Sequence, residues 1–127
     1  MATLQKSQAT ASFIVSESNG YRSRDDVTVT VSANTTFSAG TVLGKITASG
    51  KFVRHNAAAV DGSELESGVL FETIANTTAS AVDNASVNFA RDCEVNGHEL
   101  TYEAGADAPQ IITSDAALKA LGIIVRR

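Results

Sequence analysis

The sequence predicts an α+β fold that is mostly β: a small compact β-rich domain with one short C-terminal helix and an extended N-terminal arm. Valine alternates with hydroxyl residues over 27–32, which is the period of a half-buried strand. Short apolar runs separated by glycine-bearing turns fill residues 39–71. Good helix formers follow at 116–121. A chain of 127 residues favours one domain, which we expect over residues 21–127, with the arm over residues 1–20.

The expected arm is polar apart from one apolar island, formed by Phe13, Ile14 and Val15. Three apolar residues in a polar segment cannot form a core of their own. Two interpretations stay open. The island is either an edge strand folded onto the domain, or part of an arm that adds a strand to the sheet of another protein. The first residues lack the apolar core of a signal peptide, so export by a cleavable signal is not expected.

A segment with charges of both signs follows the arm, from Tyr21 to Asp26, and we expect it at the solvated surface. The strand over 27–32 comes next, with valines on one face and hydroxyl groups on the other. Residues 33–36 are expected to form a turn, after which Phe37 packs back onto the domain.

Three short strands are expected in the central stretch, with glycine turns between them at Gly50 and Gly62. They cover residues 42–46, 52–53 and 69–71. We expect Leu43 and Leu70 to be buried in this unit. The stretch has no nucleophile paired with a base and no glycine-rich phosphate loop, so we expect it to form part of the core and not an active site.

The next segment, residues 73–86, is rich in Thr, Ala, Ser and Asn, which predicts a loop with one short strand. Alternation over 87–90 predicts a strand that continues to Val95. Asn96-Gly97 is a hairpin-type turn signal. Residues 105–109 are expected to be irregular.

The helix is expected to begin at Ser114, whose side chain can cap its N-terminus, and to end at Gly122. Such a helix has about two turns, so it needs packing through Leu118 and Leu121 to persist. Residues 123–125 are expected to form a final strand.

Charge and hydropathy exclude two classes of partner. The net charge is −4, and the pairs Arg22/Arg24 and Arg126/Arg127 are too small for a nucleic-acid footprint. No apolar run approaches the roughly 20 residues that cross a bilayer, so no membrane span is expected. Cys93 is the single cysteine, which excludes an intrachain disulfide.

The chemistry-bearing residues do not form a recognisable active site. His55 and His98 are expected to be isolated histidines at the surface or in turns, without a second ligand at metal spacing. Cys93 is expected to be a buried structural thiol. Asp61, Glu64 and Glu66 form the densest acidic group, but they lack the ordered oxygen pattern of a calcium loop, and Asp61-Gly62 fits a turn better. We therefore expect no enzymatic activity, no metal and no cofactor.

Six stretches occur in an order and spacing that together are specific. They are NGYRSRD (19–25), AGTVLGKI (39–46), GKF (50–52), DGS (61–63), GVL (68–70) and AALKALGI (116–123). Over most of the chain, from about Asn19 to Val125, this arrangement resembles the head decoration protein family of tailed bacteriophages.

The resemblance implies a homotrimer that binds the expanded capsid at its local three-fold positions and stabilises the head against the pressure of packed DNA. The major capsid protein would be the partner, and the N-terminal arm, disordered in the free trimer, would add strands to its edge. The protein would lie on the capsid exterior of the virion after assembly in the host cytoplasm. The expected capsid-binding residues are Phe13, Ile14, Val15, Tyr21, Arg22 and Arg24. The chain departs from the phage lambda member of this family in its longer ending after Gly105 and in its charged segment 21–26.

One alternative is an adhesion or carbohydrate-binding module on a virion or cell surface, with residues 73–86 as its binding loop. The chain has no tryptophan and few other aromatic residues, which such sites often use. A minor tail or fibre component is a further alternative.

Overall fold

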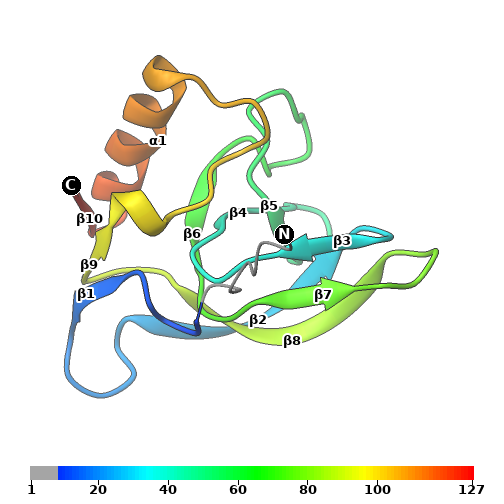
Figure 1. Cartoon of the computed structure of the whole chain (residues 1–127), viewed down its shortest axis with the longest axis horizontal. Helices are drawn as coiled ribbons and strands as arrows, with labels where there is room; N and C mark the ends of the chain where they lie inside the picture. Colours follow the sequence, from blue (N-terminus) through cyan, green and yellow to red (C-terminus); the bar gives the residue numbers. More distant parts are fainter. Residues whose placement is uncertain (1–8) are drawn as a thin grey trace, which may run out of the picture.

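The computed structural model describes residues 9–127, which form a β-rich domain with one α-helix (Figure 1). The fold class expected from the sequence is confirmed. The elements, in order, are β1 (Ile14–Glu17), β2 (Arg24–Val31), β3 (Thr35–Phe37), β4 (Val42–Lys45), β5 (Phe52–Arg54), β6 (Glu66–Leu70), β7 (Ile74–Asn76), β8 (Val82–Phe89), β9 (Cys93–Asn96), the 3₁₀ helix η1 (Gly97–Glu99), α1 (Ala108–Ala120) and β10 (Ile123–Arg126).

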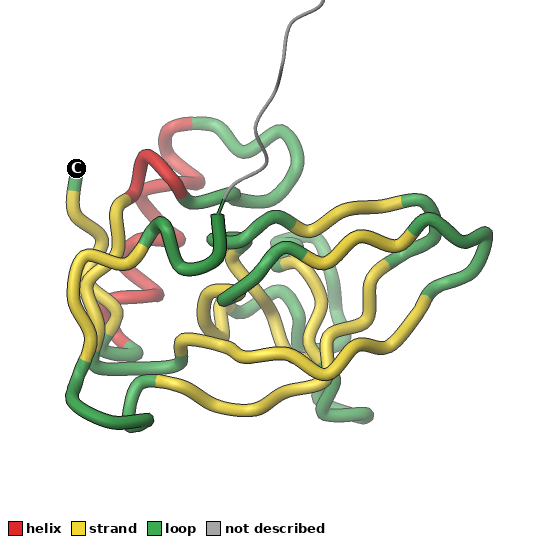
Figure 2. The backbone as a smooth tube through the Cα atoms, turned by 60° about the horizontal axis from the view of Figure 1, so that its bottom comes forward, coloured by secondary structure: helices red, strands yellow, loops and turns green. Residues whose placement is uncertain are grey.

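Five strands close into a barrel in the order β2-β5-β4-β6-β8. Its longest pairing is between β2 and β8, which run antiparallel from Arg24 opposite Phe89 to Val31 opposite Val82. The two-stranded sheet of β3 and β7 lies beside the far end of this ribbon, away from α1 (Figures 1 and 2). Closure of the barrel leaves no free edge among its five strands. One apolar cluster fills it, made of Val29, Val31, Phe37, Leu43, Phe52, Leu70 and Ile74.

A second sheet, in the order β1-β9-β10, stands at the end of the molecule where α1 lies (Figure 1). β10 runs parallel to β9, and parallel neighbours need a long crossover, which η1 and α1 supply. Leu118 of α1 is fully buried in a second apolar cluster with the inner faces of these strands. That cluster contains Phe13, Ala39, Val42, Val69, Phe89, Cys93, Val95, Leu118 and Ile123.

The alternating pattern over 27–32 is confirmed as strand β2, with Val29 and Val31 fully buried. The prediction that Leu43 and Leu70 lie in the core is also confirmed. The turn at Gly62 is held by its neighbour, because the Asp61 carboxylate accepts hydrogen bonds from the Ser63 backbone and hydroxyl groups. Gly62 itself has φ +107°, a conformation that side chains other than glycine rarely adopt.

Three expectations between residues 73 and 97 were wrong. The strand expected to continue to Val95 ends at Phe89, and β9, which begins at Cys93, belongs to a different sheet. Strand β8 begins at Val82, within the expected loop, because pairing with all of β2 extends it. Asn96-Gly97 does not form a hairpin. The neighbours of β9 are β1 and β10 rather than the following segment, and Asn96 instead caps η1 by accepting a hydrogen bond from the His98 N–H.

The helix begins at Ala108, six residues before the expected Ser114. Asp107 and Gln110 form a reciprocal capping box, and Pro109 stands in the first turn, where its missing N–H costs nothing. Ser114 lies inside the helix. Leu118 packs as expected, but Leu121 is 39% exposed. The stop at Gly122 is confirmed, with φ +90°.

The apolar island of the expected arm is part of the domain's own sheet in this structure. β1 pairs antiparallel with β9 and forms the edge of the sheet β1-β9-β10. This arrangement is the first of the two interpretations, an edge strand folded onto the domain. Residues 1–8, which belong to the same expected arm, lie outside the described residues.

Candidate interaction surfaces

The three residues of the apolar island have different environments. Phe13 is fully buried and meets the Phe89 ring edge-on, with 5.7 Å between the ring centroids. Ile14 is half-buried against the same cluster. Val15 is 54% exposed. In this conformation Val15 is available to a partner, whereas Phe13 anchors the strand to its own domain.

Tyr21 and Arg22 form a protruding polar and aromatic surface at the turn between β1 and β2. The Tyr21 side chain is 82% exposed, which is unusual for so large a ring. The Arg22 guanidinium donates to the Asp92 carboxylate at 2.8 Å. The surface position expected for residues 21–26 is therefore found for Tyr21 and Arg22, which are accessible to another protein, whereas Ser23 is fully buried.

Arg24 lies behind this surface and joins β2 to β1. Its guanidinium donates two hydrogen bonds to the Glu17 carboxylate, at 2.6 and 3.0 Å. Those hydrogen bonds hold the pKa of Glu17 below its usual value. The same guanidinium lies 4.9 Å from the centre of the Phe71 ring and 5.3 Å from that of Phe89. Arg24 is thus engaged within the domain, and its main effect is to hold the two strands together.

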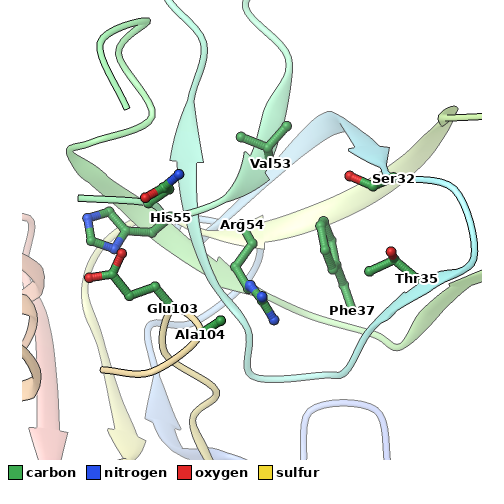
Figure 3. Close-up of a pocket in the computed structure, with 9 residues that line it drawn as sticks. Ser32, Thr35, Phe37, Val53, Arg54, His55, Glu103 and Ala104 are labelled. Atoms are coloured by element: carbon green, nitrogen blue, oxygen red, sulfur yellow. The ribbon is translucent and has the colours of Figure 1, made fainter. Parts of the chain in front are cut away.

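An open pocket of about 350 Å³ lies at the end of β5, between the barrel and the segment before α1 (Figure 3). The Arg54 side chain projects into it, between the side formed by His55 and Glu103 and the side formed by Phe37 and Thr35. The lining residues are Ser32, Thr35, Phe37, Val53, Arg54, His55, Asn56, Glu103 and Ala104. No sequence motif marked this pocket, because its residues come from three regions of the chain that lie far apart in sequence.

His55 was expected at the surface or in a turn, and this expectation was wrong. Its side chain is buried, with Nε2 3.0 Å from the Glu64 carbonyl oxygen and 3.3 Å from Glu66 Oε1. The Ser114 hydroxyl donates to that same Glu66 oxygen at 2.5 Å. Serine and histidine therefore both contact the carboxylate and not each other, so the cluster does not activate a nucleophile. It instead joins α1 to the barrel.

Cys93 is buried, as expected, and desolvation raises the pKa of its thiol to about 11. A thiol that stays protonated at neutral pH is a poor nucleophile. Within residues 9–127, no group of three or more His, Cys, Asp or Glu side chains is placed to hold a metal ion. None of the helices described there is long and apolar enough to span a membrane.

One polar side chain near the start of the 73–86 segment forms hydrogen bonds inside the domain. Asn76 is buried, and its amide donates to the carbonyl oxygens of Val31, Ser32 and Ser80. Its amide oxygen accepts from the backbone and hydroxyl of Thr78. These groups give no support to the alternative of a carbohydrate-binding loop.

The exposed features of the described residues are aromatic, apolar and charged groups on a small barrel, which are suited to contacts with other proteins. Comparison with protein families gives the particular class. Residues 3–123 match the family described as Bacteriophage lambda head decoration protein D. The chain belongs to this family, and it is a structural capsid protein of the bacteriophage head. A comparison with curated proteins found no match.

Proposed function

We propose that this protein binds the expanded phage head as a homotrimer at the three-fold positions and stabilises the shell against the pressure of packed DNA. The family match over residues 3–123 carries this proposal. A trimer that bridges neighbouring capsid subunits stabilises only the expanded lattice that it fits, by mass action. Addition takes place in the host cytoplasm, and the mature location is the capsid exterior.

The proposed attachment element is the N-terminal segment, up to about residue 20, together with the adjoining surface. β1 is an edge strand, so one side of its backbone has no strand neighbour in the sheet and can pair with the major capsid protein. Val15, Tyr21 and Arg22 supply exposed side chains next to that edge. Three such elements in one trimer bind jointly, so a weak contact of each becomes strong attachment.

The roles proposed for the remaining expected residues follow from their burial. Phe13 and Arg24 position β1 rather than touch the capsid, because Phe13 is buried and Arg24 is engaged with Glu17. Ile14 is half-buried, so it both helps to position β1 and contributes to the contact with the capsid. Substitution of Phe13 or Arg24 should therefore impair binding only through a loss of structure.

The test is co-sedimentation of the purified protein with expanded, undecorated heads. We expect Val15→Asp and a variant lacking residues 1–8 to bind much more weakly than the original chain, with unchanged thermal midpoints. Val60→Asp is the matched control, because Val60 is 96% exposed in the loop between β5 and β6. If Val15→Asp and the truncated variant bind as well as the control does, the N-terminal segment is not the attachment element.

A further inference from the structure

Arg54 differs from the other arginines of the chain in having no carboxylate partner among the described residues. Within residues 9–127, five arginines have a carboxylate oxygen within 4.0 Å, and Arg54 has none. The paired ones are Arg22 with Asp92, Arg24 with Glu17, Arg91 with Asp25, Arg126 with Glu94 and Arg127 with Asp115. No hydrogen bond from the Arg54 guanidinium to another described residue is formed either.

No carboxylate in the pocket around Arg54 forms an ion pair with it. Glu103 lines the same pocket, but neither of its oxygens lies within 4.0 Å of the Arg54 guanidinium, and its Oε2 accepts a hydrogen bond from the Ala57 backbone N–H at 2.8 Å. The other polar side chains that line it are those of Ser32, Thr35, His55 and Asn56. A half-buried guanidinium beside an open cavity is a suitable receptor for one additional carboxylate.

Asp26 is the counterpart of Arg54 among the carboxylates. It is exposed on β2, and within the described part of the chain its side chain takes part in no ion pair and no hydrogen bond. Neighbouring Asp25, by contrast, is held by Arg91 at 2.6 Å. Asp26 lines a second open pocket together with Tyr21, Arg24 and Val87, and the Arg24 guanidinium there is bound to Glu17.

The strand register keeps these two groups apart within one chain. β2 and β5 run parallel, with Val29 opposite Phe52. Asp26 precedes that pair by three residues and Arg54 follows it by two. Five residues of strand correspond to about 16 Å along the barrel, which is too far for an ion pair. The complementary charges therefore lie on different parts of the surface.

We propose that Arg54 of one copy of this chain pairs with Asp26 of the next copy in the trimer. This inference rests on the homotrimer proposed above. In a cyclic trimer each interface joins two different surfaces, so one copy can present its carboxylate to the pocket of its neighbour, three times around the ring. Each copy then supplies the group that the other lacks, and complementary charges fix which surfaces meet.

The experiment is a charge swap, measured by sedimentation equilibrium and light scattering on the full chain. Arg54→Glu places two carboxylates together and should weaken trimer formation at least about 30-fold. Asp26→Arg alone should weaken it similarly. The double variant, Arg54→Glu with Asp26→Arg, should recover most of the lost association. Lys119→Glu is the matched control, since this exposed lysine forms no ion pair among the described residues, and it should leave the trimer intact.

Each outcome decides between the proposals. A trimeric original chain whose association is insensitive to both single substitutions refutes the Arg54–Asp26 pair and leaves the trimer standing. A monomeric original chain refutes the trimer and the pair together. Intact trimers of Arg54→Glu that no longer bind heads would show that Arg54 meets a capsid carboxylate, which also refutes the pair. Circular dichroism of each variant separates lost association from lost folding, and the double variant supports the pair only if it restores the trimer.

Discussion

The burial of Phe13 predicts that the apolar island is part of the folding core. Phe13→Ala removes a fully buried aromatic side chain and its edge-on contact with Phe89. Phe→Ala substitutions in cores cost about 3–5 kcal/mol of unfolding free energy. For a chain of this length, a loss of about 4 kcal/mol lowers the thermal midpoint by about 15 °C.

The control for this prediction is on the same strand. Val15→Ala removes a side chain that is 54% exposed and should cost less than about 1 kcal/mol. Both variants can be compared with the original chain by urea unfolding and thermal melts at one protein concentration. An unchanged midpoint for Phe13→Ala, together with lost binding to heads, would refute our reasoning, because Phe13 would then be a docking residue and not a core residue.

Three further predictions concern the core, the helix and the thiol. Leu43→Ala or Leu70→Ala should each cost about 2–5 kcal/mol in urea unfolding, since both side chains are fully buried in the barrel; a loss below 1 kcal/mol would mean that the barrel core repacks around the cavity. Asp107→Ala should cost about 1 kcal/mol by removing the capping box of α1, and Asp107→Asn, which retains the cap, should cost less. Because the pKa of Cys93 is raised from 9.0 to about 11, its contribution to stability is fully present below pH 9 and is lost as the pH rises towards 11. The thiol of the folded protein should accordingly react slowly with a disulfide reagent at pH 8 and rapidly in urea, and equal rates would show that Cys93 is accessible.

Helix α1 shows how a local signal can be present and still be misread. The capping pattern of Asp107 and Gln110, with Pro109 between them, stands in the sequence and marks the true start of the helix. Ser114 offered a second plausible cap and a shorter helix. The tertiary structure uses Ser114 differently, since its hydroxyl donates to Glu66 on the neighbouring strand β6.

The interaction surfaces were predicted only in part. Exposure of Tyr21 and Arg22 follows from a run of charged residues, which is a local property. The pocket of Arg54 could not be foreseen, because its lining residues, Ser32, Thr35 and Phe37, residues 53–56, and residues 103–104, come together only when the barrel closes. The burial of His55 has the same origin, since Glu64 and Glu66 approach it from across the loop.

The sequence by itself determined the β-rich class, the strand over 27–32, the turn at Gly62 and the end of the helix at Gly122. It also determined a family resemblance that the match over residues 3–123 confirms. These features depend on periodicity, backbone conformation and the order of short motifs, which short stretches of the sequence determine. Only the tertiary structure decided that β2, β5, β4, β6 and β8 close into a barrel and that Phe13 lies in the core. It also decided that Arg54 and Asp26 have no partner among the described residues of their own chain. Those outcomes depend on contacts between residues far apart in sequence, which no short window of the sequence contains.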